Sequence, residues 1–226
     1  SGHIIFLDHT PTGDGTLAFI SATTDRPPLP AVMPLGGGAV RLLGADRIPA
    51  EFPAGRLVTP KQVVYRASDG VAVHAQLFEP TTGAGRRPAV IYIHGGPPRQ
   101  MLLGWHYSDY YTNAYATNQY LASRGFVVLS VNYRLGIGYG YEFHQPERAG
   151  VNGASEYLDI KAAGEWLAAQ PNVDPKRIGV YGGSYGGYLV AMALGRDSKL
   201  FAAGVDIHGV HDRTINRTRN LVSPDR

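Results

Sequence analysis

The chain has 226 residues, of which 44% are hydrophobic and 17% are charged, and it carries a formal net charge of +3 and no cysteine. The lack of cysteine excludes disulfides, thiol catalysis and thiolate metal sites. The small net charge, with no run of five Lys or Arg residues, argues against a nucleic-acid-binding surface.

Hydropathy and composition also limit the setting of the chain. No stretch approaches the ~20 apolar residues that a membrane-spanning helix needs, and the N-terminal segment lacks the basic region of a signal peptide. We therefore expect no membrane contact. Two locations agree with the sequence. One is the cytoplasm, and the other is the periplasm or the cell exterior after removal of an upstream signal. The charged share lies below the roughly 25% of a typical soluble domain, which favours a piece of a larger protein.

Residues 1–60 form the first segment, in which short β-like runs alternate with Gly and Pro turns. Strands of this length and spacing are typical of an all-β sheet or a propeller blade. Because a propeller needs at least ~4 blades of four strands, this segment is predicted to be a remnant of a larger β domain or an extension packed on the rest. The predicted strands are residues 3–7, 16–21, 31–35 and 39–43, followed by a linker at residues 49–60.

From residue 61 the pattern changes to that of an α/β fold. Two β-like runs flank an Asp-Gly pair, which predicts a hairpin. Short apolar strands then alternate with amphipathic helices, which indicates a parallel sheet covered on both faces. The aromatic stretch at residues 105–120 has helical spacing, which favours core packing over pocket lining. The predicted strands are residues 61–67, 71–78, 89–93, 126–131, 178–181 and 202–207, and the helices lie at residues 107–121, 157–167 and 188–194.

A G-x-S-x-G pentapeptide occupies residues 182–186, between a predicted strand and a predicted helix. This is the setting of a nucleophile elbow, in which a strained turn projects the serine hydroxyl from the carboxyl edge of the sheet. We therefore predict Ser184 as the catalytic nucleophile. The Tyr185 amide, at the start of the helix, is expected to face the oxyanion. The alternative is a Gly-rich turn with an incidental serine.

A second glycine-rich loop, His-Gly-Gly-Pro at residues 94–97, follows the strand at residues 89–93. Hydrolases with a nucleophile elbow take their second oxyanion donor from a loop in this place, and glycine lets the backbone approach the substrate closely. We expect Gly96 to supply that amide, with Gly95 as the next candidate and His94 orienting the loop. The alternative is an ordinary Gly-Pro turn.

The general base and its acid are harder to place. In this fold the chain order is serine, then Asp or Glu, then His, yet only 42 residues (226 − 184) follow Ser184. A βαβ unit takes ~30 residues or more, so we expect both groups to lie outside the chain. Asp206 and His208 are predicted to belong to the wall of the site. A local triad through Asp206 and His211, and a metal held by His208 and His211, are weaker alternatives.

Together these segments resemble the prolyl oligopeptidase family of serine peptidases, especially its dipeptidyl-peptidase and acylaminoacyl-peptidase branches. The resemblance implies an α/β-hydrolase fold, with residues 61–226 as the N-terminal two-thirds of the catalytic domain and residues 1–60 as a propeller-blade remnant. Leu135 and Gly136 depart from it, since the family usually has Gly-Ser there. The similar segments are residues 182–188, 94–97, 132–134, 138–140 and 206–212, with residues 14–27 resembling the final propeller blade.

The resulting hypothesis is a serine peptidase that hydrolyses peptide bonds through an acyl-enzyme at Ser184, without a metal or organic cofactor. Arg134 is a candidate for the site wall, where it could hold a substrate carboxylate or carbonyl; a structural ion pair is the alternative.

The expected partners are a peptide substrate and a second chain or missing C-terminal segment that completes the hydrolase domain. Alone, the chain is expected to be inactive or nearly so. A carboxylesterase or lipase is the alternative function, and a non-catalytic fragment or binding module is the second alternative.

Overall fold

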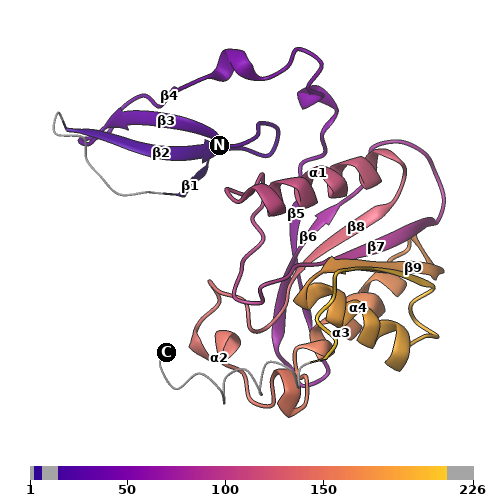
Figure 1. The fold of residues 1–226 in the computed structure, drawn as a ribbon. Coiled ribbons are helices and arrows are strands. Elements are labelled where there is room, and N and C mark those ends of the chain that lie inside the picture. Colours follow the sequence, from indigo (N-terminus) through magenta and orange to yellow (C-terminus); the bar gives the residue numbers. More distant parts are fainter. Residues whose placement is uncertain (1–2, 7–14, 213–226) are drawn as a thin grey trace, which may run out of the picture.

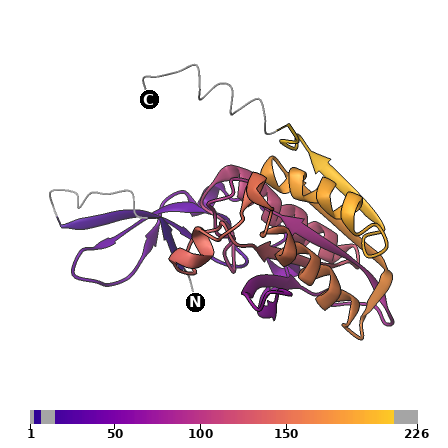
Figure 2. The ribbon, with the colours of Figure 1, turned by 90° about the horizontal axis from the view of Figure 1, so that it is seen from below.

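The computed structural model describes residues 3–6 and 15–212, which form two separate sheets (Figure 1). The smaller sheet is antiparallel, with its strands in chain order. It lies to one side of the larger α/β body, also when the molecule is seen from below (Figure 2). Its strands are β1 (His3–Phe6), β2 (Thr16–Ala22), β3 (Leu29–Pro34) and β4 (Arg41–Leu42).

All four predicted strands of this sheet are present, and the fourth is shortened. The fourth forms only two residues of ladder, because β3 pairs with it only through Ala31 and Val32. Leu7, at the end of the first predicted strand, and the turn at residues 13–14 lie outside the described residues. The predicted linker contains a single turn of 3-10 helix, Ala54–Arg56, and another such turn, Ala45–Arg47, precedes it.

The larger sheet has the strand order β10-β9-β7-β8-β6-β5. The four strands β7 to β10 run parallel to one another, and the β5–β6 hairpin joins β8 in antiparallel pairing. Strand β9 starts earlier than predicted, because Val173 pairs with Arg87 across an irregularity in the ladder. The strands are β5 (Lys61–Arg66), β6 (Ala72–Phe78), β7 (Arg87–Ile93), β8 (Val127–Asn132), β9 (Val173–Gly183) and β10 (Ala203–Ile207).

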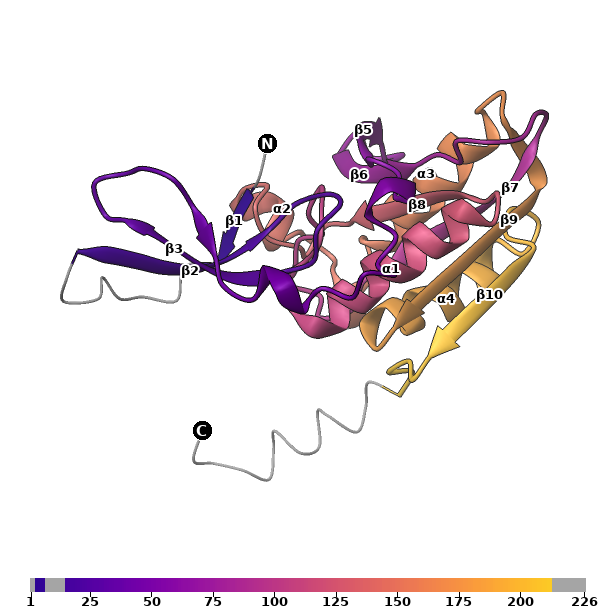
Figure 3. The same ribbon diagram turned by 90° about the horizontal axis from the view of Figure 1, so that it is seen from above.

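Helices cover both faces of this sheet (Figure 3). The helix α1 (Asp109–Ser123) packs on one face, and α3 (Tyr157–Ala168) and α4 (Tyr185–Arg196) pack on the other. A short helix α2 (Tyr141–His144) and a 3-10 turn, Gly150–Asn152, lie in the connection from β8 to α3. Within the described residues, no helix is both long and apolar enough to cross a bilayer. The fold is that of an α/β hydrolase.

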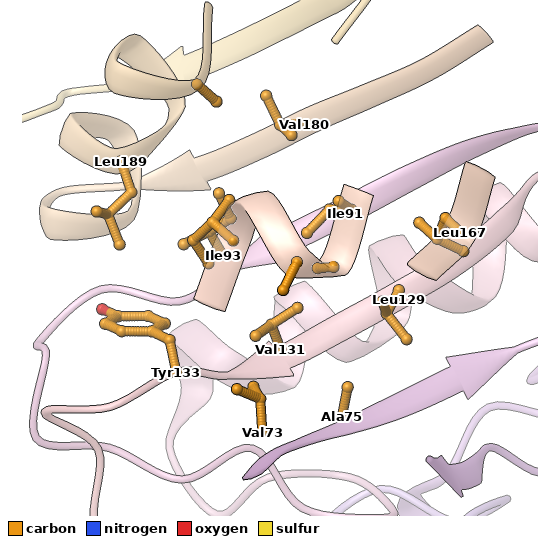
Figure 4. Close-up of a cluster of buried hydrophobic side chains, with 14 of the residues drawn as sticks. Val73, Ala75, Ile91, Ile93, Leu129, Val131, Tyr133, Leu167, Val180 and Leu189 are labelled. Carbon is orange, nitrogen blue, oxygen red and sulfur yellow. The ribbon is translucent and has the colours of Figure 1, made fainter. Parts of the chain in front are cut away.

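The core has two layers because side chains alternate along a strand. Ile91 and Ile93 of β7 belong to the buried cluster shared with α3 and α4, in which Leu189 of α4 lies beside Ile93 (Figure 4). Phe78 of the hairpin packs instead against Tyr115 of α1, with ring centroids 5.4 Å apart. The aromatic stretch at residues 105–120 divides in the same way. Trp105, Tyr111 and Tyr115 are buried, whereas Tyr107, Tyr110 and Tyr120 are exposed.

The edge of the sheet at β10 is incompletely covered. The Val205 side chain is 60% exposed and that of Ile207 is 42% exposed. An apolar groove of about 570 Å³ runs between this strand and α1 and is lined in part by Leu121 and Phe126. Among the described residues β10 pairs only with β9, so its outer edge is unpaired.

Candidate active site

Ser184 forms the sharp turn between β9, which ends at Gly183, and α4, which begins at Tyr185. Its φ of 56° and ψ of −117° lie in a region that residues with a Cβ rarely adopt. A Cβ on Gly182 or on Gly186 would overlap the carbonyl oxygen of Ile93 at the end of β7. Glycine is therefore required on both sides of the serine, since the neighbouring strand passes too close for any side chain.

Backbone hydrogen bonds fix the position of this turn. The Ser184 amide donates to the Ile207 carbonyl at 3.0 Å, at the end of β10. The Ser184 carbonyl accepts from Tyr188 at 3.1 Å, in the first turn of α4, and from Val210 at 3.3 Å. The half-buried serine is thus held by the strand and the helix that meet there.

The loop at residues 94–97 lies directly against the turn. A Cβ built on Gly95 would come within 2.8 Å of the Gly183 carbonyl oxygen and within 3.3 Å of the Ser184 Cβ. Gly96 follows with a φ of 117°, which also favours glycine. The structure therefore brings together four of the predicted site residues, Ser184, Tyr185, Gly95 and Gly96.

His94 is fully buried at the start of this loop. Its Nδ1 lies 2.8 Å from the Gly95 carbonyl oxygen, which can only accept, so the proton is on Nδ1. Burial lowers the pKa of His94 to about 4, so the ring is neutral at pH 7. The buried ring and its hydrogen bond to the Gly95 carbonyl hold the backbone of the loop at residues 94–97.

Asp206 and His208 lie at the end of β10, beside the turn. Asp206 Oδ1 accepts from the Gly209 amide at 2.8 Å, and Oδ2 lies 2.6 Å from His211 Nε2. His208 Nε2 lies 3.4 Å from the hydroxyl oxygen of Tyr110. Within the described part of the chain, no group of three or more His, Cys, Asp and Glu side chains is arranged to hold a metal ion.

Arg134 is engaged elsewhere. Its side chain is only 4% exposed, and its guanidinium contacts Asp159 at 2.5 Å and Asp69 at 2.5 Å. The pKa of Asp69 is lowered by its hydrogen bond from Arg134. These contacts tie the β5–β6 hairpin to the start of α3, and they are the structural ion pair given as the alternative for this residue.

Three residues near the site are not apparent from the sequence. Tyr110 stands over the turn, where a Cβ on Gly183 would overlap its hydroxyl. The helical spacing of the tyrosines predicts core packing, and Tyr111 and Tyr115 do lie on the buried face of α1. Tyr110 lies outside that face and is exposed. The other two contact site residues directly: the Tyr133 hydroxyl donates to the His94 carbonyl oxygen at 2.8 Å, and Glu156 Oε1 accepts from the Tyr185 hydroxyl at 2.5 Å.

Comparisons with known proteins agree with this geometry. Residues 112–221 match the family described as "Prolyl oligopeptidase family". The chain is 34% identical over 208 residues to "Uncharacterized peptidase YuxL" of Bacillus subtilis (strain 168), covering 86% of the chain and 30% of that relative. It is 36% identical over 137 residues to "Dipeptidyl aminopeptidase BIII" of Pseudoxanthomonas mexicana, covering 61% of the chain and 18% of that relative.

Solved structures show the same likeness. A puromycin-hydrolyzing peptidase of Mycobacterium tuberculosis superposes with a TM-score of 0.76 at 27% identity, over 88% of the chain and 30% of that protein. The chain spans less than a third of the length of each of these three relatives.

Proposed function

Because the chain belongs to the prolyl oligopeptidase family, we propose that the protein is a serine peptidase that cleaves peptide bonds through an acyl-enzyme at Ser184. The observation that carries the proposal is the strained backbone of Ser184 at a strand–helix turn, with a glycine loop packed against it. A nucleophile elbow needs both features, because the hydroxyl must project toward a substrate whose carbonyl oxygen meets backbone amides.

The proposed reaction has two steps. The Ser184 Oγ attacks the peptide carbonyl carbon while its proton passes to a general base. The amides of Tyr185 and Gly96 donate to the oxyanion of the tetrahedral intermediate, and Gly95 lets the loop approach the serine. The C–N bond then breaks, the departing amine takes the proton from the base, and water hydrolyses the ester by the same route in reverse.

We propose that the base and its acid come from outside the described residues, on a segment that continues the hydrolase domain or on a second chain. The exposed apolar side chains of Val205 and Ile207, with the unpaired edge of β10, support an additional strand and covering helix at this place. Residues 1–60 would then be a propeller-blade remnant and linker, and residues 61–226 the N-terminal two-thirds of the hydrolase domain. On this arrangement, the 226 residues alone have little activity.

The test compares an aminoacyl p-nitroanilide with a p-nitrophenyl ester as substrates of the full-length protein. We expect hydrolysis of the anilide that Ser184→Ala abolishes. Hydrolysis of the ester alone would assign a carboxylesterase, and hydrolysis of neither would leave a binding module. His211→Ala distinguishes the source of the base, because a loss of ~10³-fold or more would place the base in the pair of His211 with Asp206.

A further inference from the structure

Three aromatic rings form a buried column that joins the two loops of the candidate site. His94 starts the glycine loop, Tyr133 follows β8, and Tyr185 is the first residue of α4. The His94 and Tyr133 ring centroids lie 4.4 Å apart with planes at 21°, and those of Tyr133 and Tyr185 lie 6.4 Å apart with planes at 11°. All three side chains are at most 5% exposed.

Hydrogen bonds anchor the column at both ends. The Tyr133 hydroxyl donates to the His94 carbonyl oxygen at 2.8 Å. The Tyr185 hydroxyl donates to Glu156 Oε1 at 2.5 Å. The Glu156 carboxylate, fully buried beside the first residue of α3, also accepts from the Gly150 amide at 3.1 and 3.2 Å. The column therefore ends on a carboxylate that is itself fixed by the backbone.

The contacts act on the peptide units that carry the predicted oxyanion donors. The His94 carbonyl, which accepts from Tyr133, belongs to the same planar peptide as the Gly95 amide. His94 Nδ1 donates in turn to the Gly95 carbonyl oxygen, which belongs to the same planar peptide as the Gly96 amide. At the other end, fixing the Tyr185 ring restrains its Cα, to which the amide nitrogen is bonded. One packed unit thus sets both donors relative to Ser184.

The chemistry of Glu156 points the same way. Burying a carboxyl group is unfavourable, and well-packed apolar side chains of similar volume are often as stable or more stable. The described partners of Glu156 are a hydroxyl and an amide. These two partners orient the Glu156 carboxyl group by directional hydrogen bonds, and neither of them is a basic side chain. Orientation of Tyr185 is a function that an apolar replacement could not supply.

We propose that Glu156 and Tyr133 are positioning residues of the oxyanion hole, which hold the amides of Tyr185 and Gly96 at a common point beside Ser184. This inference rests on the proposed function. Oxyanion donors act on charge that develops only in the transition state, so displacing them lowers kcat and leaves KM nearly unchanged. Because removal of a whole donor costs about 10²–10³-fold in kcat, a displaced donor should cost ~10-fold or more.

The test measures kcat, KM and thermal stability of three tyrosine-to-phenylalanine variants in the full-length protein. Tyr185→Phe and Tyr133→Phe each remove a single hydroxyl from the column. Tyr65→Phe is the matched control, because that tyrosine is 6% exposed and donates to the Asp159 carbonyl at 3.2 Å in the same core. We expect kcat to fall ~10-fold or more in the first two variants, with KM within about twofold, and to stay unchanged in the control.

Two substitutions of the carboxylate add a rescue test. Glu156→Gln keeps an oxygen that can accept from the Tyr185 hydroxyl, whereas Glu156→Leu removes it. We therefore expect the glutamine variant to retain more of the parent kcat than the leucine variant, measured well below both melting temperatures. Equal kcat values for the two would overturn the part assigned to Glu156.

The outcomes separate this inference from the function on which it rests. If the parent protein hydrolyses the anilide and loses this activity in Ser184→Ala, the proposed function holds. If Tyr185→Phe and Tyr133→Phe then change only stability, as Tyr65→Phe does, the column is structural and the inference is wrong. If Ser184→Ala retains the parent activity, the proposed function fails and the inference fails with it.

Discussion

Lowering the pH from 7 to 5 should destabilise the protein through His94. Its ring is fully buried, and burial lowers its pKa to about 4, against a usual value of about 6.5. With the proton on Nδ1, a second proton would go to Nε2, a buried atom without a hydrogen-bond partner among the described residues. Because the folded pKa is lowered, the unfolded chain binds more protons. Stability is present above pH 6.5 and is lost as the pH falls toward 4.

The two pKa values set the size of the effect. At pH 5 an unfolded histidine favours its protonated form about 30-fold, whereas the folded ring stays about nine-tenths neutral. The difference lowers the free energy of unfolding by about 2 kcal/mol relative to pH 7. Against a typical total of roughly 5–15 kcal/mol, this loss is readily measured.

Urea unfolding at pH 7 and pH 5 measures the loss in the parent protein and in His94→Gln. The substitution removes the titrating group, so the variant should lose about 2 kcal/mol less than the parent between the two pH values. His106, which is 2% exposed and whose pKa burial also lowers to about 4, provides a second site for the same comparison. Equal losses in the parent and His94→Gln would refute the assignment of a neutral buried ring.

Three further substitutions test the packing around the site. Ser184→Gly should raise the free energy of unfolding by about 1 kcal/mol in a urea titration while abolishing activity, because glycine relieves the positive φ. Asp159→Asn should lower the free energy of unfolding by about 1–3 kcal/mol, because Arg134 loses its buried charged partner and keeps only the partly exposed Asp69; an unchanged free energy of unfolding would contradict this. Gly186→Ala should lower the free energy of unfolding by about 3 kcal/mol or more, or prevent folding, because the new Cβ would overlap the Ile93 carbonyl oxygen. Unchanged melting of this last variant would refute the close approach.

The alternation of strands and helices was predictable because periodicity records which face of each element is buried. The residues at which the helices and strands begin and end were less predictable. The helix α4 begins at Tyr185, three residues before the predicted range 188–194, although Gly186 and Gly187 are poor helix formers. They occur there because the strand end and the loop at Gly209 approach too closely for a side chain.

The candidate site was predictable where its backbone demands glycine. Ser184, Gly95 and Gly96 lie in short motifs, so their proximity could be expected before any fold was known. The contact of Tyr185 with Glu156 could not be expected, because 29 residues separate them and an isolated glutamate before a helix is ordinary. Such partners are set by packing between distant elements rather than by local sequence.

The central claim is that Ser184 is the nucleophile, and its most direct test is the site of covalent modification by a fluorophosphonate. The full-length protein and its Ser184→Ala variant would be treated with the probe, digested and analysed by mass spectrometry. We predict one adduct, on the peptide that contains Ser184, and none on that peptide in the variant. An adduct on a different serine, or labelling that survives the substitution, would contradict the account.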